Sequence, residues 1–191
     1  TDRELLEDKL GKHGRDLYIY ANGLENSPVQ PFDAKREVKS VGSGNTFSRD
    51  ISGLSDIKPA LMVLSEQVGM RLRKHGLYAN GVQRTIKNPA FVSFTRQKQV
   101  QSTNVTENIY NAALDLLVKN WNVKMPIRAL TVTALDPSEE KRVQQLNFFE
   151  NADSQTDTKK ENLQKALDKL KDKYGKDTVQ SASLMKSDLF R

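Results

Sequence analysis

The 191-residue sequence contains no cysteine and only two histidines, His13 and His75. Without cysteine there is no disulfide, no cysteine-bound zinc and no thiol nucleophile. Two histidines far apart in sequence leave little from which to build a metal site or a catalytic triad. No apolar run approaches membrane-spanning length, and no signal peptide is visible. These absences predict a cytoplasmic protein that has no membrane partner.

Positive charge is concentrated in the middle of the chain. Residues 35–136 carry fifteen Lys and Arg against seven Asp and Glu, whereas residues 1–34 carry four against seven and residues 137–191 carry eleven against ten. A basic excess on one domain is typical of a surface that binds a polyanion. An ordinary basic domain has the same balance, so charge alone does not decide the function.

The apolar pattern predicts one α+β domain. Four runs have the composition of strands: residues 38–50, 82–87, 91–101 and 127–135. One helix is expected between Ser55, as its cap, and Gly76, and a second behind a capping box of Asn104 and Glu107. The order β-α-β-β-α-β predicts a four-stranded antiparallel sheet with both helices on one face, the split βαβ arrangement. The opposite face of the sheet is left bare.

The rest of the chain surrounds this domain. Four segments are expected: the end of a neighbouring domain with a tether (1–34), the sheet domain (35–137), a linker (138–158), and a C-terminal helix with a tail (159–191). Because the chain begins with Thr rather than Met, we expect it to be a piece of a longer protein.

The C-terminal helix is predicted from Lys159 to Tyr174. Its apolar residues form a narrow stripe among charged ones: Leu163, Leu167, Leu170 and Tyr174. A helix of this length is marginal alone in water, so we expect the stripe to be covered. Three coverings stay open: its own domain, a part of the full protein outside this sequence, or a second copy in a weak homodimer. The first two are favoured, because two heptads rarely hold a dimer together.

Strand alternation predicts what the bare face shows to solvent. The outward positions carry small hydroxyl- or amide-bearing side chains, such as Gln83, Thr85, Thr95, Gln97, Thr131 and Thr133. No aromatic side chain is expected there for stacking single-stranded bases, so contact with a duplex backbone fits better. Arg84, Arg96 and Arg128 fall on the inward side of their strands, which predicts bulges or strand ends that run past the helices.

A short motif stands in the linker, Gln145-Leu146-Asn147-Phe148-Phe149. A polar, charged linker cannot bury two phenylalanines in a core of its own, and an exposed apolar cluster often marks a binding site. The motif resembles the peptide by which bacterial DNA polymerases dock on the sliding clamp. The alternative is that the aromatic side chains fold back onto the domain.

Further motifs resemble the C-terminal little finger of Y-family translesion DNA polymerases, preceded by the end of the thumb. They follow one another along nearly the whole chain: Leu10-Gly11-Lys12-His13-Gly14, Ala21-Asn22-Gly23, Lys39-Ser40-Val41-Gly42, Thr46-Phe47, Thr95-Arg96-Gln97 and Ile127-Arg128. The resemblance implies a DNA-binding domain that grips duplex primer–template DNA. Together with the charge and the bare face, it yields these expected contacts with the DNA backbone: Lys39, Ser40, Gly42, Thr46, Lys87, Arg96, Lys98 and Arg128.

The resemblance also implies where catalysis lies. The carboxylates that hold Mg²⁺ in this family belong to the palm, which would precede residue 1, so this segment alone should not polymerise and should need no cofactor. Asp136, Glu139 and Glu140 fit a turn better than a metal site. The alternative function is a stand-alone, non-catalytic DNA-binding clamp adaptor that self-associates through its C-terminal helix.

Overall fold

The computed structural model describes residues 2–32, 37–142, 153–175 and 178–180. The chain forms two compact units, Thr1–Glu37 and Val38–Arg191, and each is described by itself. In the described residues, no helix combines the length and the apolar character that crossing a bilayer requires.

The first unit is a pair of short helices, α1 (Arg3–Leu10) and α2 (Lys12–Ala21). The Asp2 side chain caps α1 by accepting the Glu4 N–H at 3.3 Å. A Cβ at Gly14 would lie 1.9 Å from the Leu6 carbonyl oxygen, so the glycine lets the two helices touch. Among the described residues of these two helices no apolar side chain is buried, so the pair has no core of its own.

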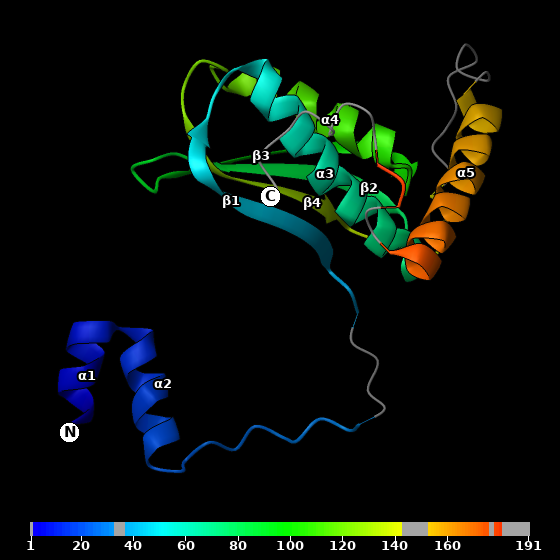
Figure 1. The fold of residues 1–191 in the computed structure, drawn as a ribbon. Helices are drawn as coiled ribbons and strands as arrows, with labels where there is room; N and C mark the ends of the chain where they lie inside the picture. The colour runs from blue at the N-terminus through cyan, green and yellow to red at the C-terminus, as the bar shows by residue number, and fades with distance from the viewer. Residues whose placement is uncertain (1, 33–36, 143–152, 176–177, 181–191) are drawn as a thin grey trace. The chain divides into compact units, whose positions relative to one another are not determined.

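The second unit is a four-stranded sheet with helices on one face (Figure 1). Its elements are β1 (Ser40–Ile51), α3 (Gly53–Lys74), β2 (Ala79–Lys87), β3 (Ser93–Thr103), α4 (Thr106–Asn120), β4 (Ile127–Leu135) and α5 (Asp153–Tyr174). The strand order is β1-β4-β2-β3 and every neighbouring pair is antiparallel. The predicted fold class is confirmed.

The core lies between the sheet and helices α3 and α4. Val82 and Ile86 of β2, like Leu130 and Val132 of β4, are fully buried, while the residues between them on β4 are partly exposed. Side chains alternate between the two faces of a strand, so this pattern confirms the predicted inward and outward positions of β2 and β4. The predicted alternation of β3 is not seen in its burial, because this edge strand is exposed on both sides from Ser93 to Gln99. Helix α3 adds Leu61, Leu64, Val68 and Leu72 at helical spacing.

The predicted start of α3 is wrong by three residues, because the cap position is Ser52 rather than Ser55. The helix begins at Gly53, which has a φ of 77° and donates its N–H to the Val123 carbonyl at 2.7 Å. Ser52 occupies the cap position without a side-chain hydrogen bond, and Ser55 lies inside the first turn. A tertiary contact therefore determines where this helix starts.

The predicted capping box of α4 is also wrong. Helix α4 begins at Thr106 with Val105 at the cap position, and the buried Asn104 side-chain oxygen has no hydrogen-bond partner. The Thr106 N–H donates instead to the Gln164 side-chain oxygen of α5 at 2.9 Å. An orphan donor at the start of one helix is thus satisfied by a distant segment.

Helix α5 docks on the sheet domain through its polar side. The guanidinium of Arg73 donates to both carboxylate oxygens of Asp168, at 2.6 and 3.1 Å, and to Gln164 at 2.5 Å. Lys171 pairs with Glu66, and Lys160 with Glu107. The prediction that its own domain covers the apolar stripe is wrong, because Leu163, Leu170 and Tyr174 remain exposed and only Leu167 is half-buried.

Candidate functional site

The open face of the sheet, opposite α3 and α4, forms four rows of residues across all four strands. The register gives these rows: Thr46–Ala129–Lys87–Ser93, Gly44–Thr131–Thr85–Thr95, Gly42–Thr133–Gln83–Gln97, and Ser40–Leu135–Gly81–Gln99. Most of these side chains are small and end in a hydroxyl or an amide. No aromatic side chain stands in any of the four rows. We use the name open face for these residues.

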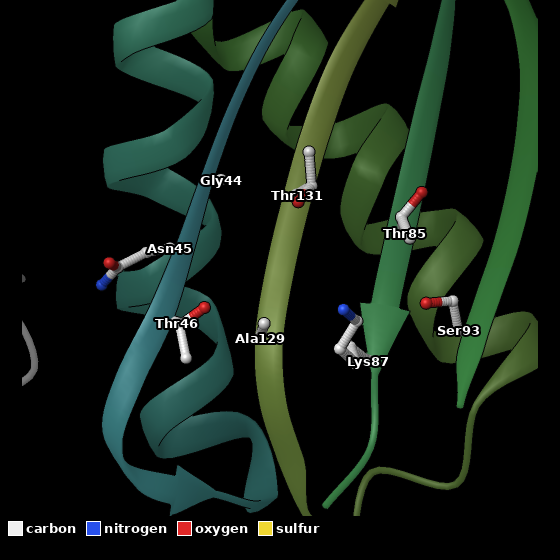
Figure 2. A pocket seen from close by; sticks show the side chains of 8 residues that line it. All are labelled: Gly44, Asn45, Thr46, Thr85, Lys87, Ser93, Ala129 and Thr131. Carbon is white, nitrogen blue, oxygen red and sulfur yellow. The ribbon is translucent and has the colours of Figure 1, made fainter. Parts of the chain in front are cut away.

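All residues of the first two rows except Thr95, together with Asn45, line a shallow hollow of about 310 Å³. Figure 2 shows that side chains from all four strands contribute to it. The lining consists of Gly44, Asn45, Thr46, Thr85, Lys87, Ser93, Ala129 and Thr131. The Thr85 and Thr95 hydroxyls are 2.9 Å apart, so one donates to the other and both keep further hydrogen-bonding capacity. Hydroxyl groups beside one lysine suit the recognition of phosphate and sugar oxygens.

Glycines leave the β1 side of the open face without side chains at two positions. A Cβ on Gly44 would lie 2.4 Å from the Thr131 hydroxyl oxygen and 3.1 Å from its Cβ. A Cβ on Gly42 would lie 3.0 Å from the Thr133 hydroxyl oxygen. The two threonines therefore occupy space that side chains of β1 would need. Glycines at these positions also leave the backbone of β1 open to close approach by a ligand.

Five of the residues predicted to contact DNA belong to this face or adjoin it. Ser40, Gly42 and Thr46 are exposed on β1, and Lys87 lines the hollow. Lys39 is exposed directly before β1.

The other three predicted contacts lie elsewhere. Arg128 is at the start of β4, 3.6 Å from Asp50, beside a register shift of β1. Arg96 stands on the inward side of the edge strand β3, yet it is exposed. Lys98 is also on that side and binds Asp115 of α4 at 2.8 Å. The structure thus brings the β1 residues and Lys87 together, but not Arg96 or Lys98.

Arg84 lies directly beneath the open face. It pairs regularly with Val132 and Arg96, so the bulge or strand end predicted at this position is wrong. The side chain is buried and donates to the Leu116 carbonyl at 3.0 Å. Burial, and then the nearby Arg96 charge, lowers the pKa of Arg84 to about 10. The guanidinium therefore stays charged near neutral pH.

Sequence reasoning did not select several residues that line the hollow, among them Thr85, Ser93 and Thr131. The sequence pattern places these side chains on the outward face of their strands, but only the strand register shows that they lie in adjacent rows. The described residues bring no three of His, Asp or Glu together in a way that could hold a metal ion. The linker motif at residues 145–149 lies outside the described residues.

Comparison with known proteins gives a consistent picture. Residues 38–148 match the impB/mucB/samB family C-terminal domain. The chain is 36% identical over 189 residues to a DNA polymerase IV of Clostridium kluyveri. The aligned region covers 97% of this chain and 47% of that protein. It is 34% identical over 183 residues to a DNA polymerase IV of Acetivibrio thermocellus, and this alignment covers 95% of the chain and 45% of that protein. The chain thus spans about half the length of the curated relatives it matches.

Proposed function

Because this chain belongs to the Y family of DNA polymerases through that family's C-terminal domain, we propose that its open face grips the backbone of duplex primer–template DNA. Residues 145–149 dock the protein on the bacterial sliding clamp. Both activities serve DNA damage tolerance by translesion synthesis, in the cytoplasm.

The chemistry of the open face carries the DNA part of this proposal. Four rows of small polar side chains offer hydrogen bonds to phosphate and sugar, and Lys87 and Lys39 add charge. The rows hold no aromatic ring on which an unpaired base could stack. Phe94 points to the other side of β3, where its ring centre is 5.2 Å from that of Trp121. A duplex backbone therefore fits this face better than single-stranded bases do.

Nucleotidyl transfer is proposed to belong to another part of the protein. Phosphoryl transfer by polymerases uses carboxylates that hold two metal ions. The relatives are about twice as long as this chain, so there is room in such a protein for that centre. We assign Mg²⁺ to that centre and only DNA and clamp contacts to the segment described here.

Duplex affinity of charge variants tests the open face. Thr85→Glu with Thr131→Glu places two negative charges in the hollow and should weaken duplex binding tenfold or more, on the order expected for disturbed phosphate contacts. Asn111→Glu with Val118→Glu adds the same charge on exposed positions of α4 and is the matched control. Fluorescence anisotropy should show equal affinity for unrelated sequences and a steep salt dependence. Equal weakening by both variants would place the DNA elsewhere.

Clamp binding is tested separately. Apolar anchors of short peptides commonly contribute about 2 kcal/mol or more each. Leu146→Ala with Phe149→Ala should therefore abolish binding to the purified clamp and leave the melting temperature and the duplex affinity unchanged. Loss of folding in this variant would mean that the two residues belong to a core.

A further inference from the structure

One side of α5 faces away from the sheet domain and combines apolar and basic side chains. Leu163, Leu170 and Tyr174 are 61%, 42% and 60% exposed. Their spacing of seven and four residues puts them in one row along the helix. A second row of exposed residues follows at every fourth position: Lys165, Lys169 and Lys173. We call these six residues the outer face of α5.

The outer face cannot turn inward without breaking the contacts on the other side of the helix. Asp168 and Gln164 are both bound to Arg73, whose side chain is 3% exposed. Glu161 is 6% exposed and pairs with Lys141. These residues point toward the sheet domain, so the apolar row is held in solvent by the same contacts that dock α5. Such a row on a rigid helix is a surface ready for a partner.

The charge of the outer face argues against a second copy of this chain as the partner. In the described part of the chain, no carboxylate lies within ion-pair distance of the ammonium groups in the lysine row. The Lys173 ammonium lies 5.0 Å from the Tyr174 ring centre, which joins the two rows. Two copies packed along the apolar row would bring lysines together, which is unfavourable. A partner with carboxylates beside an apolar patch is complementary.

Chain length indicates which partner reaches this face. Phe149 and Asp153, the first residue of α5, are four positions apart, so at most about 14 Å of extended chain separates them. On the other side of the motif, Arg142 is held by the Asp136 carboxylate and by the Ser102 hydroxyl. A protein bound to residues 145–149 must therefore lie close to α5. At that distance a weak second contact has a high effective concentration.

We propose that the sliding clamp held by residues 145–149 also docks on the outer face of α5. An apolar patch of the clamp covers Leu163, Leu170 and Tyr174, and its carboxylates lie opposite the lysine row. This inference rests on the proposed clamp function, which it extends from a short peptide to a second, folded contact surface.

Clamp affinity of the full chain tests the inference in two variants. Leu163→Gln with Leu170→Gln removes the apolar row, and Lys165→Glu with Lys169→Glu and Lys173→Glu reverses the basic row. Each variant should weaken clamp binding about tenfold, because the second contact adds to avidity without being required. The effect of the charge reversal should fade as the salt concentration rises. Surface plasmon resonance with immobilised clamp measures affinity and dissociation rate.

Two control variants carry the same kinds of substitution at exposed positions outside α5. Val118→Gln removes an apolar side chain that is 54% exposed on α4. The control for the lysine-row variant reverses the charge of three exposed lysines outside α5: Lys12→Glu, Lys58→Glu and Lys124→Glu. Both controls should bind the clamp like the unaltered chain. Circular dichroism and thermal melting should show that all four variants keep their fold.

The outcomes separate this inference from the proposed function. If Leu146→Ala with Phe149→Ala abolishes clamp binding while both α5 variants bind normally, the inference is overturned and the clamp function stands. Weakened duplex binding with normal clamp binding in the lysine variant would also overturn it, as would a dimer that Leu163→Gln with Leu170→Gln dissolves. If the motif variant binds the clamp normally, the proposed role of residues 145–149 fails, and this inference fails with it because the motif no longer brings the clamp close to α5.

Discussion

Two regions of the second unit each bury an arginine, and their surroundings differ. Between α3 and α5, the Arg73 side chain is 3% exposed and faces the Asp168 carboxylate at 2.6 Å. Between the sheet and α4, Arg84 is 1% exposed, and its described hydrogen bonds go to the carbonyls of Leu116 and Phe94. The first charge is paired with a carboxylate, and the second depends on backbone dipoles.

The two buried arginine charges therefore have different effects on the protein. The Arg73 charge holds a segment that is distant in sequence, because Asp168 and Gln164 both belong to α5. The Arg84 charge is left uncompensated beneath the open face, where it adds to the positive potential that a polyanion would meet. A buried pair is costly to break from one side, whereas an unpaired buried charge can be replaced by an apolar group at little cost.

The largest expected effect comes from Arg73→Met. The substitution leaves Asp168 without its partner and removes a donor to Gln164 and to the Asn104 carbonyl. Breaking a fully buried pair from one side typically costs about 3 kcal/mol or more, and the cost is smaller here because the Asp168 side chain is 20% exposed and becomes hydrated once α5 detaches. We expect α5 to detach, with rapid amide exchange throughout Leu163–Tyr174, while the sheet stays folded. Hydrogen exchange by mass spectrometry with urea unfolding measures both.

Asp168→Asn is the companion variant for this test, since it keeps the shape and removes the charge. It should detach α5 less completely than Arg73→Met does. Protection of α5 that stays unchanged in both variants would show that the helix is held by its remaining contacts, and the comparison of the two arginines would then lose its basis.

A smaller effect is expected from Gln164→Ala. The Gln164 side-chain oxygen accepts the Thr106 N–H at 2.9 Å and so acts as the N-terminal cap of α4. Loss of a helix cap commonly costs about 1 kcal/mol. Exchange should therefore accelerate in the first turn of α4 as well as in α5. Gln164→Glu keeps an acceptor at this position, and normal protection of α4 in that variant would separate capping from general packing.

The sheet and its two faces could be predicted from the sequence, because the alternation of apolar and polar residues along a strand is visible within a few neighbouring positions. Val82 and Ile86 alternate with Gln83 and Thr85, and burial follows this alternation. The polar character of the open face was predicted in the same way. Which side chains meet across the strands was not predictable, since that depends on register.

The helix ends and the docking of α5 could not be predicted, because distant residues decide them. The cap of α4 comes from Gln164, and the start of α3 is tied to the Val123 carbonyl. For α5, the apolar pattern favoured burial of Leu163 and Leu170, yet ion pairs with α3 and α4 turn the other side inward. Apolar periodicity does not show a docking surface made of charges.

Arg84→Met should change stability by less than about 1 kcal/mol, in contrast with Arg73→Met. The apolar side chain avoids the burial of an unpaired charge, which offsets the lost hydrogen bonds. The Leu116 carbonyl keeps a donor in the Asn120 side chain at 2.9 Å. Urea unfolding of the two variants under identical conditions measures the contrast. A loss as large as that of Arg73→Met would mean that the carbonyl contacts stabilise Arg84 as well as a carboxylate would.

The smallest expected effect concerns Asp115, the carboxylate next to Leu116 on α4. Its hydrogen bonds with Lys98 and then Lys119 lower the pKa of Asp115, so it neutralises those lysines rather than Arg84. A carboxyl with a lowered pKa in the folded state stabilises the fold above its unfolded pKa and loses that contribution as pH falls through the folded pKa. Lys98→Met should therefore raise the pKa of Asp115, with Lys119 still holding it below the ordinary value.

Carbon-detected NMR of the Asp115 carboxyl measures this shift directly. The stability difference between the unaltered chain and Lys98→Met should be present at neutral pH and should disappear in acid, below the folded pKa of Asp115. The charge on Arg84 should stay the same throughout, because its pKa of about 10 is far from this range. An Asp115 titration that Lys98→Met leaves unmoved would assign the lowered pKa to Lys119 alone. Lys98 would then be available for other contacts at the edge of the sheet, including the DNA contact expected of it.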